Sequence, residues 1–355
     1  MSNRLIDFSA LNAYQDKKTQ TELLSQRFGL IEALKYNTPA NKVLTPTLVA
    51  HLQQVEGRTT EYTGLKESVI TTTSTESFTI PAHLSTSEQK TLTAVSIFSG
   101  FQVYPAWFQN NTIAMADYLA NKYDEVFMAM ASAKEVLIAA LLDTYKNQVA
   151  LSVNQVNGGD GTFAFDAGLD TLTVNKAGQK DTLFANLKTL MRIAKRAGNY
   201  NIVVNEGGFN LSLNEIAKYS ITNSKNLDFI QNLIPKFFES LNVAPESFQF
   251  KAYLMVDGAI GGVQNYPFDF RMGTVVGQKV WGIMDTPAPY IGERLNVYHN
   301  LEAVDASALG DTTAHLKMTS MEEWGFLDKF FLVTNYNSDL VNRVNDIVKV
   351  TGATS

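Results

Sequence analysis

One stretch of the chain constrains its fold more than any other. From Thr112 to Val149 there is neither proline nor glycine, and apolar residues recur at helical spacing. Asn110, Asn111 and Thr112 offer side chains that cap helix N-termini. A helix of this span would be roughly 50 Å long, enough to cross a whole domain. The predicted apolar face comprises Ile113, Ala116, Ala120, Tyr123, Phe127, Met130, Leu137, Leu141 and Tyr145. The predicted polar side comprises Asp117, Lys122, Asp124, Lys134, Asp143 and Lys146.

The segment before this helix has a different character. Eleven threonines fall between Thr59 and Thr93, among Val, Ile, Leu and Phe. Because β-branched residues suit a pleated strand better than a helix, Val69–Ile80 and Lys90–Tyr104 are predicted as two strands. Pro81–Ser85 breaks the pattern between them. A lone two-stranded ribbon is barely stable in water, so we expect a partner, within the chain or outside it, to support this one.

The remaining elements are short. In the N-terminal part, Lys17–Tyr36 has helical spacing with Gly29 as a weak point, and Thr45-Pro46 can open a second helix. The later segments predict helices at Asp181–Arg196 and Leu227–Leu241, and strands at Asn201–Asn205, Phe248–Val256, Val275–Met284, Arg294–Leu301 and Phe330–Val333. Leu340–Val350 fits a strand, and its first part also fits a helix.

Composition narrows the classes of protein. Charged residues make up 18% of the chain, the formal net charge is −6, and there is no cysteine. A low fraction of charged residues is compatible with large subunit interfaces. A net negative chain is poorly suited to bind the phosphates of nucleic acid. The absence of cysteine excludes disulfides, thiolate metal sites and cysteine nucleophiles. The N-terminus has no secretion-signal pattern, and no apolar run approaches the roughly 18 residues of a membrane span.

A search for chemistry predicts no catalytic, cofactor-binding or metal-binding residue. The four histidines lack ligand spacing, and Val256–Gly262 lacks the order of a phosphate loop and predicts a turn. The oxygen side chains of Asn157, Asp160, Asp166 and Asp170 could be imagined as calcium ligands, but their spacing does not match an EF-hand loop. The acidic pairs Glu302 with Asp305 and Glu322 with Glu323 carry no specific signal. The tryptophans are expected in the core. The four histidines are His51, His83, His299 and His315, and the three tryptophans are Trp107, Trp281 and Trp324.

The order of elements resembles the capsid subunits of tailed bacteriophages with the Hong Kong 97-type fold. Tyr104–Asn111 lies where that family passes from its extended loop into its spine helix, and Asn201–Asn205 resembles a short strand of its axial domain. The resemblance implies an α+β fold. It divides the chain into an N-terminal arm (1–55), an extended β-hairpin loop (56–105), a peripheral domain with the spine helix (106–160), an α/β axial domain (161–319) and a return to the peripheral domain (320–355).

The resemblance implies a major capsid protein that self-assembles into the icosahedral shell around a phage genome. Pentamers and hexamers would form, with other virion proteins such as portal or decoration proteins as partners. The shell would enclose DNA without specific binding, contact no membrane, and be part of a virion assembled in the host cytoplasm. Inter-subunit contacts are expected at Lys66, Glu67, Glu76 and Lys90, although neither lysine can be matched to the cross-linking lysine of some relatives.

Three alternatives remain open from the sequence. An encapsulin-type nanocompartment would share the fold and package a cargo protein. Another phage structural protein, such as a tail-tube or sheath subunit, belongs to the same broad class. A carboxylate-dependent hydrolase on an α/β domain would require a deep pocket with converging acids in residues 160–320.

Overall fold

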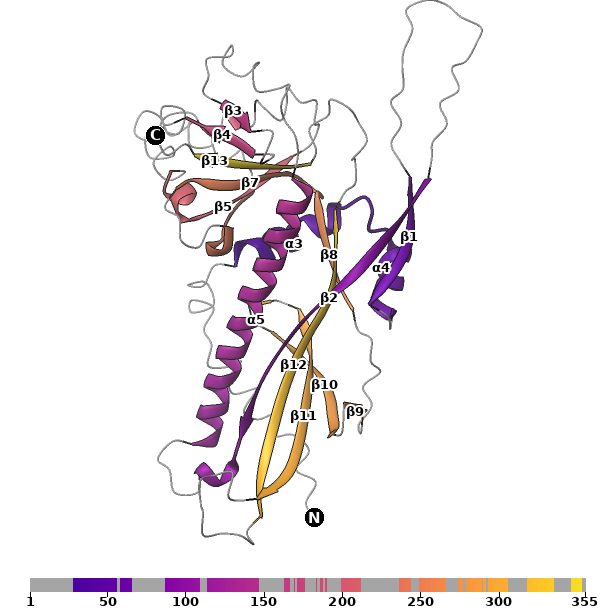
Figure 1. Ribbon diagram of the computed structural model, residues 1–355, viewed down its shortest axis with the longest axis vertical. Helices are drawn as coiled ribbons and strands as arrows, with labels where there is room; N and C mark the ends of the chain where they lie inside the picture. Colours follow the sequence, from indigo (N-terminus) through magenta and orange to yellow (C-terminus); the bar gives the residue numbers. More distant parts are fainter. Residues whose placement is uncertain are drawn as a thin grey trace, which may run out of the picture.

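The chain folds around two β-sheets and one long helix in a computed structural model (Figure 1). The structure describes residues 28–55, 58–65, 87–108, 114–146, 163–166, 171–175, 199–211, 236–243, 249–265, 274–276, 279–288, 293–305, 318–334 and 346–352, with single positions 169, 183, 186, 187, 189, 290 and 291. The named helices are α3 (Gly29–Asn37), η1 (Thr38–Ala40), α4 (Pro46–Gln54), η2 (Pro105–Phe108), α5 (Met115–Tyr145) and η4 (Leu241–Val243). No described helix combines the length and hydropathy needed to cross a bilayer.

The larger sheet has seven strands in the order β1-β2-β12-β11-β10-β9, and β8 also pairs with β12. Its members are β1 (Thr59–Leu65), β2 (Ser87–Val103), β8 (Ile260–Gln264), β9 (Thr274–Val276), β10 (Lys279–Pro287), β11 (Arg294–Asp305) and β12 (Met318–Thr334). All of their pairings are antiparallel. The helix α5 lies along one face, where aromatic rings of Tyr123 and Phe127 pack edge-on against Phe326 of β12. Burial of these large apolar surfaces is what attaches the helix to the sheet.

The smaller sheet lies at the C-terminal end of α5 (Figure 1). Its order is β3-β4-β13-β7-β5-β6, with parallel pairings between β13 and β4 and between β5 and β6. Its members are β3 (Phe163–Asp166), β4 (Thr171–Val174), β5 (Tyr200–Val204), β6 (Lys236–Glu239), β7 (Lys251–Val256) and β13 (Ile347–Gly352). A separate core that includes Leu172, Ile202 and Leu254 holds it together.

The two sheets are joined by a short turn. The strand β7 belongs to the small sheet and β8 to the large one, with only residues 257–259 between them. Gly258 in this turn has a φ of 84°, in the left-handed region that glycine tolerates best. A Cβ atom there would lie 2.2 Å from the carbonyl oxygen of Ala40. The turn expected at Val256–Gly262 is therefore confirmed only at residues 257–259, since Ile260–Gly262 belong to β8. The glycine of this turn is required by both its backbone conformation and its close approach to Ala40.

We expect Gly258→Ala to lower the free energy of unfolding by about 3 kcal/mol, because backbone strain adds to the clash with Ala40. Gly261→Ala is the matched control, since the nearest obstacle to its Cβ is the flexible end of the Leu44 side chain. Urea unfolding followed by circular dichroism would measure both. Equal losses for the two variants would contradict the role assigned to the turn.

The long helix is confirmed, with three corrections. It runs from Met115 to Tyr145, and its N-cap is Ala114 with no side-chain cap, so the predicted Asn and Thr cap was wrong. In its second half Ile138 and Leu142 are fully buried, whereas Tyr145 is exposed. A seven-residue spacing drifts by about 20° per repeat on a straight helix, so the predicted apolar face rotated away from the sheet. Lys134, predicted on the polar side, is also buried.

The predicted ribbon is confirmed in its second strand. The strand β2 covers Lys90 to Val103 and pairs with β1, which begins at Thr59. The first strand expected at Val69–Ile80, and the break after it, lie outside the described residues. The described first strand therefore starts ten residues earlier in the chain than the threonine and valine pattern suggested.

Three other expectations were wrong in part. The end of the predicted helix Leu227–Leu241 is strand β6, which pairs in parallel with β5. The segment Val275–Met284 contains two antiparallel strands, β9 and β10, rather than one. Trp107 is 47% exposed rather than in the core, whereas Trp324 is buried as expected. The ambiguous segment Leu340–Val350 ends in strand β13. The side chain of Trp281 lies outside the described set.

Candidate functional site

The first candidate surface is the base of the β1–β2 ribbon. Residues Ala94 to Val103 of β2 pair with β12 in the body of the large sheet. Residues Ser87 to Thr93 pair only with β1 among the described strands. This part of the ribbon leads away from the body of the subunit (Figure 1). The large sheet therefore extends beyond its own core as a two-stranded projection.

The helix α4 braces the base of this ribbon from within the chain. Leu52 is fully buried in a small core with Ala94 and Phe331, and Leu92 packs against the same core. His51 Nε2 lies 2.8 Å from Thr60 Oγ1 of β1. Support for the ribbon is thus partly intramolecular, which was one of the two possibilities left open by the sequence.

Lys90 is the only one of the four predicted contact residues that lies in the described part of the chain; Lys66, Glu67 and Glu76 are outside it. Lys90 stands opposite Tyr62 in the ribbon. Together with Leu92, Tyr145 and Leu332 these residues line a shallow pocket of about 230 Å³. The lysine therefore lies at the junction between ribbon and body, on the side of the α5 C-terminus.

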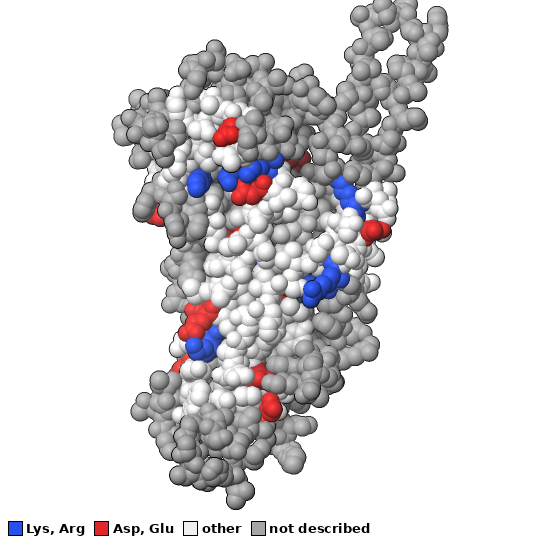
Figure 2. Space-filling model, viewed as in Figure 1, with Lys and Arg blue, Asp and Glu red and all other residues white. Residues whose placement is uncertain are grey.

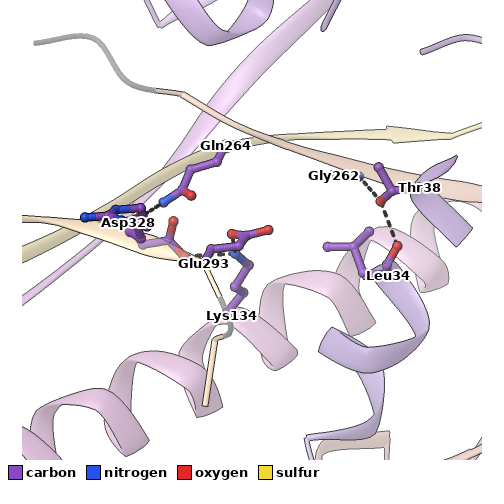
Figure 3. A network of polar contacts seen from close by, with 8 residues as sticks. Leu34, Thr38, Lys134, Gly262, Gln264, Glu293 and Asp328 are labelled. Carbon is purple, nitrogen blue, oxygen red and sulfur yellow. Dashed lines mark hydrogen bonds and ion pairs between the residues drawn. The ribbon is translucent and has the colours of Figure 1, made fainter. Parts of the chain in front are cut away.

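A buried ionic network attaches the middle of α5 to the large sheet (Figure 3). Lys134 Nζ lies 2.6 Å from a carboxylate oxygen of Glu293 and 3.0 Å from one of Asp328. It also lies 4.3 Å from the centre of the Phe330 ring. Burial by itself would lower the pKa of Lys134, but Asp328 and Glu293 raise it above its ordinary value. Lys134 is therefore a charged group that links α5 to β12.

The next residue of α5 attaches the helix to a different part of the fold. One carboxylate oxygen of Glu135 accepts hydrogen bonds from the backbone N–H groups of Leu30 and Ile31, at 2.7 and 3.2 Å. The other accepts from Ser240 Oγ at 2.6 Å and Asn242 Nδ2 at 3.0 Å. Burial raises the pKa of Glu135, and these four donors partly oppose that shift. Glu135 thereby caps the N-terminus of α3, whose own N-cap residue supplies no side-chain bond.

The face of the large sheet opposite α5 carries an exposed aromatic residue. Phe98 of β2 is 64% exposed, and its ring lies 6.4 Å from that of Tyr298 on β11. Gly325 of β12 lies between them, and a Cβ there would meet the Phe98 ring at 2.8 Å. The glycine thus makes room for the aromatic pair to lie across the strand.

Burial raises the pKa of Tyr298 above its ordinary value of 10.0 to about 12. The unfolded chain ionises this phenol first, so its contribution to stability is full below pH 10 and falls as the pH rises toward 12. We expect Tyr298→Phe to make this alkaline decline shallower. The free energy of unfolding measured as a function of pH would show this difference. Tyr145→Phe is the control, because Tyr145 is exposed. An unchanged decline would contradict the prediction.

Within the described residues, the side chains considered as catalytic or metal-binding candidates in the sequence do not lie together in one site. His299 packs on the Trp324 ring, with Nε2 3.6 Å from Glu322. Glu323 accepts hydrogen bonds from Gln102 and Asn300, and Asp166 accepts one from the backbone of Leu169. No group of three or more metal-ligating side chains occurs within the described ranges. Residues outside them are His83, His315, Asn157, Asp160 and Asp170, and the side chain of Asp305.

Charged side chains are sparse on the face seen in Figure 2. They form small groups of both signs, separated by a broad neutral surface. The described residues of this face therefore present no extended basic area of the kind that attracts phosphates. The low overall charge of the sequence is thus visible as an uncharged surface over the middle of the molecule.

No protein-family model matches this chain, and no curated protein matches it. Among solved structures, it is similar to a chain from Mycobacterium phage Che8, with 13% identity over 87% of this chain and 89% of that chain and a TM-score of 0.46. It is similar to one from Mycobacterium phage Adephagia, with 10% identity, coverages of 86% and 90% and a TM-score of 0.47. The capsid structure of cyanophage P-SCSP1u contains a chain with 8% identity, 84% coverage of both chains and a TM-score of 0.41.

Proposed function

We propose that this chain is the major capsid protein of a tailed phage, with the Hong Kong 97-type fold, and that it assembles into the icosahedral shell around the genome. The observation that carries the proposal is the ribbon: residues Ser87 to Thr93 of β2 extend beyond β12 and have β1 as their described strand partner. A projection of this kind gains stability when a neighbouring copy covers it. Repeated contacts of that type close into a symmetric shell.

The arrangement of α5 and the two sheets supports the same proposal. A helix of 31 residues is about 46 Å long and lies along the large sheet, as a spine helix would. We assign α5, β2 and β10 to β12 to the peripheral domain, and β3 to β7 with β13 to the axial domain. In this proposal residues 279–305 belong with the peripheral strands and 347–352 with the axial ones, in place of a boundary at 319.

The partners follow from this assignment. Axial domains would meet around pentamers and hexamers, and the ribbons would contact neighbouring subunits through Lys66, Glu67, Glu76 and Lys90. Portal and decoration proteins would complete a virion assembled in the host cytoplasm. The protein would enclose DNA without specific binding and would be a structural protein rather than an enzyme. The buried ionisable residues described above support this, because they join structural elements instead of lining a pocket.

The proposal is tested with a shortened ribbon. Leu65 and Ser87 are directly opposite one another, so residues 66–86 can be replaced by Asn-Gly, which closes a tight hairpin. The full chain is expected to form rings, sheets or closed particles in electron micrographs and by sedimentation. The shortened chain should keep the unfolding midpoint of the full chain and remain unassembled.

Three outcomes would count against the proposal. A full chain that stays monomeric at high concentration would overturn the shell function. Equal assembly of full and shortened chains would remove the ribbon as the assembling element. Particles that retain a second, stoichiometric protein when purified from the source cell, and no DNA, would indicate a nanocompartment instead.

A further inference from the structure

We infer that α3 is a brace between the two sheets, and that the bonds at its two ends depend on one another, so that release of one end loosens the other. This inference concerns the single chain and does not rest on the proposed shell function. One end of this nine-residue helix touches α5 and the end of β6, and the other end touches the turn that joins the sheets.

The N-terminal end of α3 is held by contacts with α5 and with the small sheet. Glu135 of α5 accepts from both Leu30 N–H and Ser240 Oγ, so one carboxylate binds α3 and the segment after β6 at once. Phe28 forms an isolated antiparallel bridge with Ser240. A Cβ on Gly29 would lie 2.2 Å from the carbonyl oxygen of Glu239, which explains the glycine that the sequence suggested was a weak point. The backbones here pack in direct contact.

The C-terminal end of α3 is held by a fully buried amide pair. Asn37 and Asn201 of β5 exchange hydrogen bonds of 3.0 and 3.1 Å, and both side chains are 0% exposed. Asn37 Oδ1 also accepts from the backbone N–H of Gly258 at 2.8 Å. Asp257 accepts from Asn201 at 2.9 Å and from the Tyr36 hydroxyl at 2.9 Å. The end of α3 is therefore bonded directly to the turn between the sheets.

A further contact reaches the large sheet. Thr38 Oγ1 accepts from the backbone N–H of Gly262 on β8 at 3.0 Å and donates to the carbonyl oxygen of Leu34 at 2.7 Å (Figure 3). The strand β8 begins at Ile260, so α3 and its C-cap residue Thr38 are hydrogen-bonded to residues on both sides of the turn. Among the described elements, α3 is thus bonded to α5, to the small sheet, to the turn and to the large sheet.

The helix itself is too short to be rigid without these bonds. Isolated helices shorter than about 12 residues are marginal in water, because the first turn is costly to form. The stability of α3 therefore depends on its ends, which are about 14 Å apart. Loss of the bonds at one end should loosen the helix and, through it, the bonds at the other. This reciprocal dependence distinguishes a brace from two unrelated local contacts.

Hydrogen–deuterium exchange of the full chain tests the inference. Glu135→Gln weakens the N-terminal end, because it removes the negative charge to which the N–H groups of Leu30 and Ile31 are bonded. We expect about tenfold faster exchange at Gly258 and Gly262, which is about 1.4 kcal/mol in opening free energy. Asn37→Ala weakens the C-terminal end, and we expect a similar increase at Asn242 and Val243. Exchange in the middle of β12 should stay as in the unmodified chain, which separates release of α3 from unfolding.

The controls make the outcome decisive. Thr45→Ala removes the N-cap of α4, a neighbouring helix outside the brace, and should leave Gly258 and Gly262 unchanged. If Asn37→Ala accelerates exchange throughout the chain, Thr38→Val supplies the same test, since it removes only the bonds of one hydroxyl. Faster exchange confined to the altered end in each variant would overturn the inference. The result is independent of whether the protein forms shells.

Discussion

Lys134→Met is expected to lower the free energy of unfolding by about 3–5 kcal/mol, because it leaves a buried carboxylate without its cation. Asp328 is 0% exposed, and the Lys134 ammonium is 3.0 Å from one of its oxygens. Glu293 retains 25% of its side-chain exposure and can turn toward water, so Asp328 accounts for most of the loss. Urea denaturation would measure this loss, provided that the variant and the unmodified chain have the same dependence of unfolding free energy on urea concentration.

The same substitution at an exposed site is the control. Lys122 and Glu125 form a surface pair of 2.6 Å on the same helix, so Lys122→Met should lower stability by less than about 1 kcal/mol. The double variant Lys134→Met/Asp328→Leu should recover most of the loss, since apolar residues can replace a buried ion pair. Similar effects of Lys134→Met and Lys122→Met would contradict the importance of the network.

The pH dependence of the Lys134→Met variant follows from Asp328. Burial raises the pKa of Asp328 above its ordinary value even with the lysine present. Without the Lys134 ammonium, the pKa of Asp328 in the folded state would be raised further. A raised carboxyl pKa lowers stability only above the pKa of the unfolded chain. The difference between the variant and the unmodified chain should therefore shrink as the pH falls toward 4.

Glu135→Ala is expected to lower the free energy of unfolding by roughly 3–5 kcal/mol. The change removes one acceptor group from four donors: two backbone N–H groups of α3, the Ser240 hydroxyl and the Asn242 amide. A buried donor without an acceptor costs its full desolvation free energy, because it has given up its hydrogen bond to water. The N-terminus of α3 would also lose its cap. Thermal and urea unfolding would both show the loss.

Glu135→Gln is the conservative comparison. Its amide oxygen can still accept from Leu30 and Ile31, while its amide nitrogen meets Asn242 as a second donor. We expect it to lose less than half of what Glu135→Ala loses. Glu125→Ala, at an exposed glutamate of the same helix, should have little effect. A loss for Glu135→Ala no larger than for Glu125→Ala would show that the four bonds are not stabilising.

One sequence signal could have identified Lys134 and Glu135 as the residues that attach α5 to the rest of the fold. Between Phe127 and Leu142, Lys134 and Glu135 are the only charged residues in a continuous run of apolar and small ones. Charges in such a run are seldom buried unless they are paired. Their adjacency also places them on different sides of the helix, so they had to serve different partners. The helical face drawn at seven-residue spacing left Lys134 on the polar side and hid this signal.

Other errors have a common physical cause. The segment Lys236–Glu239 forms strand β6 because it pairs in parallel with β5. Parallel partners come from distant parts of the chain, so local sequence does not reveal them. Local pattern alone favoured a helix there. The division of Val275–Met284 into β9 and β10 and the exposure of Trp107 likewise depend on neighbours rather than on local composition.

Local patterns in the sequence determined the elements whose periodicity is long and unbroken. The proline-free run defined α5, the threonine-rich segment defined the second strand of the ribbon, and the glycines after Val256 defined the turn. The tertiary structure alone decided which residues meet. Lys134 reaches Glu293 and Asp328, 159 and 194 residues away, and Glu135 reaches back to Leu30. Propensity acts over a few residues, whereas these pairings depend on the path of the whole chain, which only long-range packing selects.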